Sequence, residues 1–366
     1  MKYFTRIYIV FTSAVLLAGC AKEHAPNLDA QYQNADTITR FINPIKKSAL
    51  DPYVTFKDGF YYYMSTGSNY LTLSRLREMI FLDQAYSKTI YTPPADSAFN
   101  TNVSKPEIHF LDGKWYVYFS ADNGQPINRR IYAIENNSID PLLGNWEFKG
   151  KVADPAADFV ATDGSVLEYD GQLYFLWSGF KTTPTSETTI ERGLYIAKMK
   201  NPYTLEGGRV LISDPTKSWE RDQYIEDGKT FRVAIDQNPQ VIKNSAGDVF
   251  ISFTAGPCQT DNISLGLLSL KSGADPMIAS NWVKSSLPVF SSSRDAYGPA
   301  FNGFFKSADG KEDWIIYNAN LLPGQGCGTT RSPRIQKFSW NSDGTPNFGT
   351  PAGTTLGTDS LSRPSK

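Results

Sequence analysis

The stretch Asp112-Gly113-Lys114-Trp115-Tyr116-Val117 joins a turn pair to a strand-forming run, and this pattern recurs along the chain. Asp-Gly supplies the positive φ angles of a type I′ hairpin turn, and the aromatic and β-branched residues that follow it favour a half-buried strand. The turn pairs lie 54, 58, 76 and 63 residues apart, so the chain is expected to repeat one unit five times. The other copies begin at Asp58-Gly59, Asp170-Gly171, Ala246-Gly247 and Asp309-Gly310.

Each unit also has a short strand upstream of its turn, which usually opens on a proline. These strands begin with Pro52-Tyr53-Val54, Pro106-Glu107-Ile108, Gly164-Ser165-Val166, Pro239-Gln240-Val241 and Pro299-Ala300-Phe301. Such hairpin units cannot bury both faces alone, but five arranged radially can. The sequence therefore predicts an all-β fold, a five-bladed β-propeller, over residues 38–353. A two-sheet sandwich would also use hairpins, but it does not explain why a polar or acidic residue precedes most of the inner strands.

The first twenty residues have the layout of an export signal. Lys2 and Arg6 precede an apolar run from Ile7 to Leu17 that is too short to span a membrane as a helix. The run ends in Leu17-Ala18-Gly19-Cys20, which resembles the bacterial lipobox, so Cys20 is expected to carry the lipid. An ordinary signal with a chance cysteine is the alternative.

Residues 21–37 are polar and weakly patterned, which predicts a flexible tether, and residues 354–366 are expected to form a polar tail. Together with the signal, the tether predicts a membrane-anchored lipoprotein that faces the periplasm or lies on the cell surface, at a bacterial outer membrane. The lipid would be its only contact with the membrane.

The composition excludes some classes of partner. The 36 basic and 37 acidic residues nearly cancel, which argues against a nucleic-acid partner, and a monomer is expected. With Cys20 assigned to the lipid, Cys258 and Cys327 remain, and an extracytoplasmic compartment permits a disulfide between them. Three cysteines with His24 and His109 make a Cys/His zinc site unexpected, and no metal ligands are assigned.

The starts of the inner strands of a propeller converge on its axis, so the residues at those positions are the candidate site. Several carboxylates in one funnel are costly unless they bind a ligand or transfer protons. Glycoside hydrolysis uses such carboxylates, one to activate water and one to protonate the leaving oxygen. The alternative is that Asp before Pro or Gly merely begins a turn. The candidate positions carry Asp51, Glu107, Asp163, the run Asp236-Gln237-Asn238 and Gly298.

From about Phe41 to Pro351 the sequence resembles glycoside hydrolase family 43, with α-L-arabinofuranosidases as the nearest relatives and β-xylosidases and arabinanases as more distant ones. The resemblance implies an inverting glycosidase of pentose-containing plant glycans, with an oligosaccharide or polysaccharide as ligand. The matching stretches are Asn43-Pro44-Ile45, Asp51-Pro52-Tyr53-Val54, Pro106-Glu107-Ile108-His109, Thr162-Asp163-Gly164-Ser165-Val166, Trp177-Ser178-Gly179, Tyr297-Gly298-Pro299, Lys311-Glu312-Asp313-Trp314-Ile315-Ile316-Tyr317 and Arg334-Ile335-Gln336-Lys337-Phe338-Ser339-Trp340.

The resemblance also implies roles for single residues. Asp51 matches the general base that activates the attacking water. Asp163 matches the carboxylate that raises the pKa of the acid and orients it. Arg334 matches an arginine that reaches the sugar, and Glu107 is placed among the substrate-binding residues without a catalytic role.

Several positions depart from the family pattern at the centre, including Asn318 in place of a histidine and Ser104-Lys105 in place of a tryptophan before Pro106. The general acid is usually a glutamate in an Asn-Glu-Gly-Pro type of motif, but here the motif is Asp236-Gln237-Asn238-Pro239, so Gln237 has no carboxyl proton to deliver. Asp236 is the nearest carboxyl group and is assigned to substrate binding, although only a bulge would turn it inwards. Phe301 replaces a histidine near a bound ion, which puts the family's calcium site in doubt, and no cofactor is expected.

Three hypotheses follow. The first is an active, inverting glycosidase with a displaced acid. The second is a catalytically inactive glycan-binding lipoprotein, and the third is an assembly component of a surface glycan-uptake machine. The long connections Phe180 to Glu191 and Asp214 to Phe231 are expected to be solvent-exposed loops around the funnel.

Overall fold

The computed structural model describes residues 40–354 and 358–359. The signal at residues 1–20 with Cys20, the tether at 21–37 with His24, and most of the tail at 354–366 lie outside these residues. Within the described part, the fold is all-β, as predicted, and its helices are short 3-10 turns: η3 (Met79–Gln84), η4 (Pro126–Asn128), η5 (Ser218–Glu220) and η6 (Ala279–Asn281). Among the described helices, none is long and apolar enough to cross a bilayer.

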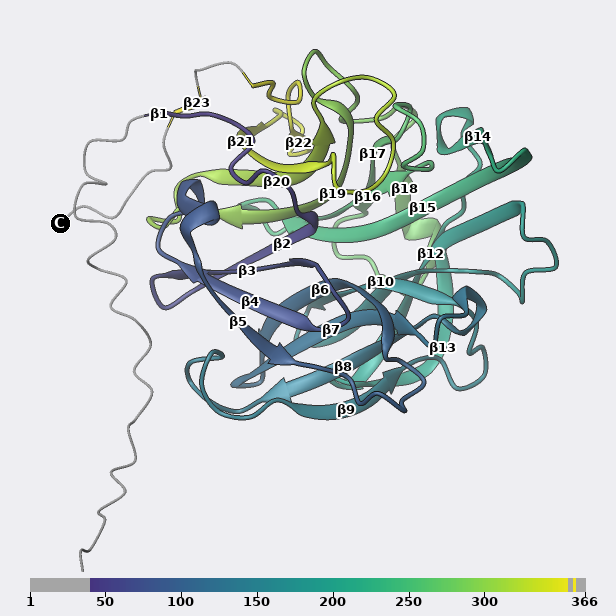
Figure 1. Ribbon diagram of the computed structural model, residues 1–366, viewed down its shortest axis with the longest axis horizontal. Coiled ribbons are helices and arrows are strands. Elements are labelled where there is room, and N and C mark those ends of the chain that lie inside the picture. The colour runs from purple at the N-terminus through teal and green to yellow at the C-terminus, as the bar shows by residue number, and fades with distance from the viewer. Residues whose placement is uncertain (1–39, 355–357, 360–366) are drawn as a thin grey trace, which may run out of the picture.

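Most described strands fall into five antiparallel meanders of four strands, numbered here in chain order (Figure 1). The first contains β2 (Leu50–Lys57), β3 (Phe60–Thr66), β4 (Leu71–Leu76) and β5 (Tyr86–Tyr91). The second contains β6 (Thr101–Leu111), β7 (Lys114–Asp122), β8 (Arg130–Asn136) and β9 (Glu147–Val152). The third contains β10 (Ala161–Tyr169), β11 (Gln172–Gly179), β12 (Thr189–Asn201) and β13 (Thr204–Ser213).

The fourth and fifth meanders complete the series. The fourth contains β15 (Lys229–Lys243), β16 (Val249–Ala255), β17 (Ser264–Leu270) and β18 (Trp282–Lys284). The fifth contains β19 (Tyr297–Lys306), β20 (Asp313–Asn320), β21 (Ser332–Trp340) and β22 (Pro346–Asn347). A two-stranded pair brings the two ends of the described chain together, β1 (Arg40–Phe41) beside β23 (Thr358–Asp359).

The repeated turn pairs lie where the sequence predicts them, between the first and second strands of each meander. In the first three, both turn residues have positive φ, for example 52° at Asp58 and 80° at Gly59, as a type I′ turn requires. In the last two, only the glycine does, at 88° in Gly247 and 73° in Gly310. Those two hairpins therefore use a different turn, although the strand order is unchanged.

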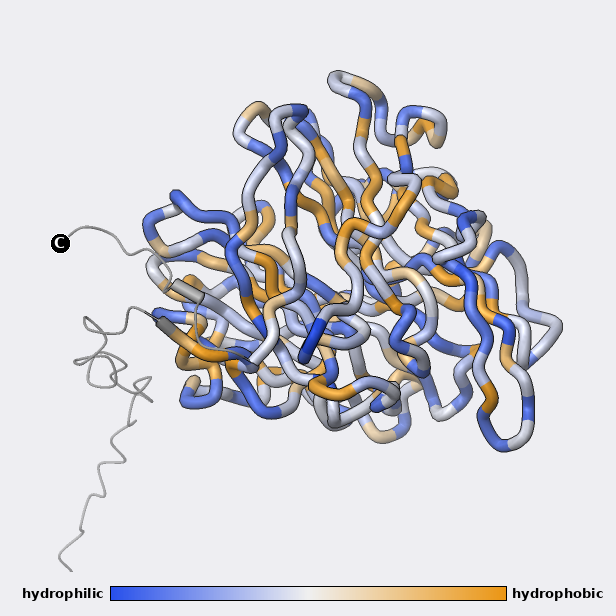
Figure 2. The backbone as a smooth tube through the Cα atoms, turned by 90° about the horizontal axis from the view of Figure 1, so that it is seen from above, coloured by the Kyte–Doolittle hydropathy of each residue, from blue (hydrophilic) through white to orange (hydrophobic). Residues whose placement is uncertain are grey.

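The second strand of each meander is apolar on both faces because each sheet packs between two others. In β3, Tyr61 and Tyr63 join one core cluster, whereas Tyr62 and Met64 join another. Successive side chains on a strand point to opposite faces, so the run Phe60–Met64 supplies both clusters at once. Figure 2 shows that apolar segments lie mainly inside the molecule and hydrophilic turns mainly at its periphery.

The core clusters link the meanders in a cycle. One cluster joins the first meander to the second, others join the second to the third, the third to the fourth and the fourth to the fifth. A further cluster returns from the fifth meander to the first and packs Tyr61 and Tyr63 with Trp314 and Ile316. The inner strands repeat this order, since β2 contacts β6, then β6 contacts β10, β10 contacts β15, β15 contacts β19, and β19 contacts β2.

The third and fourth meanders are fused into one larger sheet, which the sequence did not predict. Thr189 to Arg192 at the start of β12 pair in parallel with Arg232 to Ile235 of β15, and β14 (Arg221–Glu226) adds to the other side of β15. The expected exposed loop from Asp214 to Phe231 is therefore largely a hairpin. The ends of β12, β14 and β15 project from the body at the right of Figure 1.

Candidate functional site

A β-bulge interrupts the first strand of every meander, and one residue at each bulge has a left-handed backbone. The pairing with the second strand shifts register at this point in all five first strands. A bulge re-aims side chains locally and commonly lies beside an active site. The left-handed residues are Asp51 (φ 53°), Lys105 (φ 55°), Asp163 (φ 58°), Asn238 (φ 52°) and Phe301 (φ 51°). These five are the central positions.

Four of the central backbones are held by a neighbouring meander. In each case the N–H donates to a side-chain oxygen near the end of the preceding second strand, which offsets the cost of the left-handed conformation. The cycle closes because the first meander is held by the fifth. The bonds are Lys105 N–H to Thr66 Oγ1 (2.8 Å), Asp163 N–H to Ser120 Oγ (3.2 Å), Phe301 N–H to Thr254 Oγ1 (2.8 Å) and Asp51 N–H to Asn318 Oδ1 (2.9 Å).

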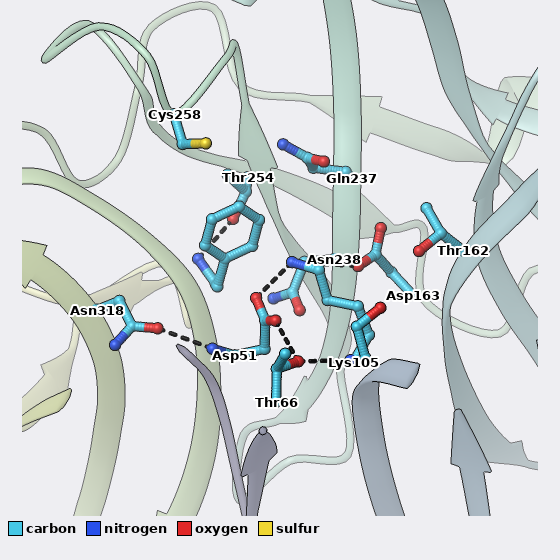
Figure 3. Close-up of polar contacts among 12 residues, drawn as sticks. Asp51, Thr66, Lys105, Thr162, Asp163, Gln237, Asn238, Thr254, Cys258 and Asn318 are labelled. Atoms are coloured by element: carbon cyan, nitrogen blue, oxygen red, sulfur yellow. Dashed lines mark hydrogen bonds and ion pairs between the residues drawn. The ribbon is translucent and has the colours of Figure 1, made fainter. Parts of the chain in front are cut away.

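Both carboxylate oxygens of Asp51 accept a strong donor. The ammonium of Lys105 lies 2.5 Å from Oδ1, and the Thr66 hydroxyl donates to Oδ2 at 2.5 Å. Figure 3 shows these three side chains turned towards one another, with Asn318 to the left, bonded to the Asp51 backbone nitrogen. The group expected to be a general base is therefore an ion-paired carboxylate in this structure.

Lys105 connects the central positions. Its ammonium is 3.5 Å from Asp163 Oδ1 and 3.3 Å from the centre of the Phe301 ring, a cation–π distance. The Asp163 side chain is completely buried and makes no hydrogen bond within the described residues, so Lys105 is its nearest cation. Lys105 is not among the predicted site residues, although it precedes Pro106 just as Asp51 precedes Pro52.

Gln237 is fixed by two hydrogen bonds. Its Oε1 accepts from the Arg192 guanidinium at 3.0 Å, and its amide nitrogen donates to the Gly256 carbonyl at 3.3 Å. Figure 3 shows Gln237 on the adjacent long strand, without a bond to Asp51 or Asp163. Arg192 comes from the parallel segment of β12, which no local sequence pattern marked.

Asp236 and Gln237 are adjacent on β15 and point to opposite faces of the strand, and the role of Asp236 in substrate binding stays a prediction. Its carboxylate is completely buried, accepts from the Ser213 hydroxyl at 2.6 Å and lies 2.9 Å from the Lys284 ammonium. Lys284 also pairs with Glu220 at 2.5 Å. Burial raises the pKa of Asp236 to about 7, against the opposing effect of Lys284. The bulge begins only after Gln237, so it leaves Asp236 facing outwards from the axis.

Arg334, expected to reach the sugar, lies elsewhere. It is fully buried and donates to the backbone carbonyls of Ala352 (2.8 Å) and Asn320 (3.5 Å). A different arginine, Arg331, approaches the centre, with its guanidinium carbon 5.9 Å from the middle of the Phe301 ring. Burial lowers the pKa of Arg331 to about 10. Arg331 thus lies nearer to Phe301 than any contact given for Arg334, and the sugar-binding role of Arg334 stays a prediction.

Glu107 is buried and lines a small cavity together with Asp51 and Lys105. His109 Nε2 is 3.1 Å from its Oε2, and the Gln240 amide donates to its other oxygen. Burial raises the pKa of Glu107, while its hydrogen bonds oppose the shift. Glu107 borders a small axial cavity next to Asp51, but it does not line the larger pocket that contains Gln237.

The larger pocket, called the central pocket here, has a volume of about 340 Å³, which is enough for a small sugar. A disulfide joins Cys258 in its wall to Cys327, with Cα atoms 5.1 Å apart, the pair that the sequence left available. Tyr224 of β14 also lines it, and its ring stacks on Phe231 with centroids 4.9 Å apart. Other lining residues are Lys105, Arg129, Asp163, Arg192, Gln237 and Phe301.

The residues at the centre do not suit a calcium ion. Calcium takes six to eight oxygen ligands, whereas Phe301 offers none and the Lys105 ammonium lies between the nearest carboxylates, Asp51 and Asp163, where it would repel a cation. Among the described residues, no group of three or more His, Cys, Asp or Glu side chains could hold a metal. No step of the chemistry is therefore assigned to a metal.

Comparison with known proteins identifies a family and several relatives. The sequence profile of Glycosyl hydrolases family 43 matches residues 41–346. An extracellular exo-α-(1→5)-L-arabinofuranosidase of Streptomyces avermitilis is 37% identical over 322 residues, which are 85% of this chain and 63% of that protein. The α-L-arabinofuranosidase 43 of Humicola insolens is 29% identical over 358 residues, 94% of this chain and 68% of that protein.

A solved structure also resembles this chain in both sequence and fold. The α-L-arabinofuranosidase from Lactobacillus brevis is 29% identical and superimposes with a TM-score of 0.75, over 86% of this chain and 98% of that one. The chain spans less than two thirds of the Streptomyces avermitilis protein, which extends beyond the matched part. The profile match covers most of the chain, and the predicted resemblance is thus confirmed: this protein belongs to glycosyl hydrolase family 43.

Proposed function

We propose that this protein recognises α-L-arabinofuranosyl groups of pentose-containing plant glycans and holds them with little or no hydrolysis. The observation that carries the proposal is the ion pair between Lys105 and Asp51. An inverting glycosidase needs a carboxylate that accepts a proton from the attacking water. Protonating Asp51 would leave the Lys105 ammonium without its nearest counter-charge, and that ammonium occupies space beside the carboxylate where the water would lie.

The amide at the expected acid position supports the same proposal. Gln237 can hydrogen-bond a glycosidic oxygen but has no acidic proton to donate to it. General acid–base assistance is typically worth about 10²–10⁴ in rate, so its loss would affect a sugar leaving group most. The named arabinofuranosidases among the relatives support arabinofuranose as the sugar.

The proposal includes the shape of the binding site. We infer that the five meanders are the blades of a closed five-bladed β-propeller with the central pocket at one end of its axis. The cycle of core clusters and the contact between β19 and β2 support closure. Five equivalent bulges, one in each first strand, support a common axis.

An active inverting glycosidase is the second candidate. Asp51 and Asp163 are both present, and the curated relatives are named as arabinofuranosidases. This reading requires Lys105 to leave Asp51 when substrate binds, and an acid other than Asp236, whose carboxylate faces Lys284.

One pair of assays tests the proposal. Purified protein is incubated with p-nitrophenyl α-L-arabinofuranoside and with an arabino-oligosaccharide, and binding of the oligosaccharide is measured by calorimetry. We expect binding without turnover of the oligosaccharide, and weaker binding in an Asp163→Ala variant of unchanged melting temperature. Rapid hydrolysis of the oligosaccharide would support the second candidate. Absence of both binding and turnover would contradict both candidates and leave the assembly role.

We also propose that the protein is exported and anchored to the membrane through lipid on Cys20. The lipobox-like sequence supports this, as does the disulfide between Cys258 and Cys327, which requires an oxidising compartment. Mass spectrometry of the N-terminal peptide from bacterial membranes is expected to find a diacylglyceryl cysteine. A Cys20→Ala variant that stays in the membrane fraction would argue against this anchor.

A further inference from the structure

The central pocket contains an arginine, Arg192, that makes no ion pair within the described part of the chain. Arg192 lines the pocket and is half-buried, and no carboxylate within the described part of the chain lies at ion-pair distance from it. One guanidinium nitrogen donates to Gln237, while Nε is buried without a hydrogen-bond partner. Burial lowers the pKa of Arg192, with a partly offsetting effect of Asp163. A partly buried arginine that has no ion-pair partner and a buried Nε without a hydrogen bond would be stabilised by a bound anion.

The other cations of the pocket differ from Arg192 in this respect. Lys105 pairs with Asp51 at 2.5 Å, and Arg129 pairs with Asp122 at 3.0 Å. Each of these charges is satisfied before any ligand binds. Arg192 is therefore the pocket cation that a ligand carboxylate can approach without displacing a protein carboxylate.

The position of Arg192 indicates which sugar of the ligand it faces. A general acid must lie within hydrogen-bond reach of the leaving oxygen, so the residue at the acid position marks the glycosidic bond. Arg192 donates a hydrogen bond to Gln237, and Tyr224 of the β14–β15 hairpin also lines the pocket. An aromatic side chain stacked on Phe231 offers a flat, half-buried face on which a second sugar ring can pack.

We propose that the pocket selects an acidic glycan, in which the sugar on the leaving-group side of the arabinofuranosyl unit is a uronic acid whose carboxylate pairs with Arg192. Arginine suits this role because its planar guanidinium matches a carboxylate with two parallel hydrogen bonds. This inference rests on the proposed recognition of arabinofuranosyl groups, and it adds the chemical class of the neighbouring sugar.

The test uses two matched ligands. One is an α-L-arabinofuranosyl disaccharide of galacturonic acid, prepared as each linkage isomer, and the other is the same disaccharide after reduction of the carboxylate to a hydroxymethyl group. Calorimetry at low salt is expected to show at least a tenfold tighter dissociation constant for the acidic form of one isomer. The preference should shrink as salt is raised, because screening weakens the ion pair.

Variants of Arg192 provide the control. Arg192→Gln keeps hydrogen bonding but removes the charge, so it should abolish the preference for the acidic form over the reduced disaccharide. Arg192→Lys should retain part of the preference. If Arg192→Gln does not fold, Arg192→Lys decides instead, because an unchanged preference in that variant would exclude the two parallel hydrogen bonds from Arg192.

The outcomes distinguish this inference from the proposed function. Equal binding of acidic and reduced disaccharides by the unmodified protein would overturn the inference and leave arabinofuranosyl recognition in place. Failure to bind either disaccharide, together with failure to bind methyl α-L-arabinofuranoside, would overturn the proposed function as well. A salt-sensitive preference that persists in Arg192→Gln would assign the carboxylate to another cation and overturn the role of Arg192.

Discussion

Replacing Lys105 with alanine is expected to raise the rate of hydrolysis of p-nitrophenyl α-L-arabinofuranoside by about 10²–10⁴, the usual range for restoring one general base. The substitution removes the ammonium from Asp51 Oδ1 and opens space for a water molecule beside that oxygen. The p-nitrophenyl group leaves without protonation, so this substrate reports the base and is insensitive to Gln237. The measurement is the initial rate of nitrophenolate release.

Lys105→Arg is the matched control, because it keeps the positive charge beside Asp51 and should stay as slow as the unmodified protein. Lys105→Ala also removes the nearest cation of Asp163, so the melting temperatures of both variants must be compared first. Equal rates for the alanine variant and the unmodified protein would show that the ion pair does not suppress turnover. A fast arginine variant would exclude the charge as the cause.

Hydrolysis of an arabino-oligosaccharide is expected to need two more changes, Gln237→Glu and Arg192→Gln, introduced together into the Lys105→Ala background. A glutamate at position 237 alone would lie beside the Arg192 guanidinium, which is 3.0 Å from the present amide oxygen. An adjacent guanidinium favours the ionised carboxylate, so this glutamate would have no proton to donate at neutral pH. Compared with the variant that carries only Lys105→Ala and Gln237→Glu, the triple variant should hydrolyse the oligosaccharide about 10²–10⁴ times faster.

The two substrates distinguish a restored general acid from an overall increase in activity. Release of nitrophenolate should change little between the single Lys105→Ala variant and the triple variant, whereas oligosaccharide hydrolysis, followed by chromatography of released arabinose, should increase. Arg192→Lys in place of Arg192→Gln keeps a cation and should leave the oligosaccharide uncleaved. Full oligosaccharide activity with Gln237→Glu and intact Arg192 would refute the proposed inhibition by that arginine.

The sequence predicted the all-β class and the family because their signals are local. The turn pair at Asp112-Gly113 and the strand that follows it can be recognised within a few residues, and so can Asp51 and Asp163 beside Pro52 and Gly164. The parallel pairing of β12 with β15 could not be predicted in this way. It joins Thr189–Arg192 to residues more than forty positions later, and neither segment carries a pattern that specifies its partner.

Lys105 and Arg331 were not predicted, and they lie beside Phe301. For Lys105 the reason is the bulge in β6, because a bulge changes which residue of a strand faces a given side and charge alone does not reveal its register. A second signal was available: Thr66 lies seven residues after the turn glycine Gly59, and Ser120, Ser178 and Thr254 occupy the same offset in their own units.

The bonds that hold the central backbones have an evolutionary consequence. Lys105, Asp163 and Phe301 are held at their amide groups by a neighbour's hydroxyl, and Asp51 at its amide by Asn318, so their own side chains are not needed for that attachment. A mutation at one of these positions can exchange an acid for a base or an aromatic ring while the fold persists. Such a scaffold can lose one chemistry and acquire another by single steps, without passing through an unfolded ancestor.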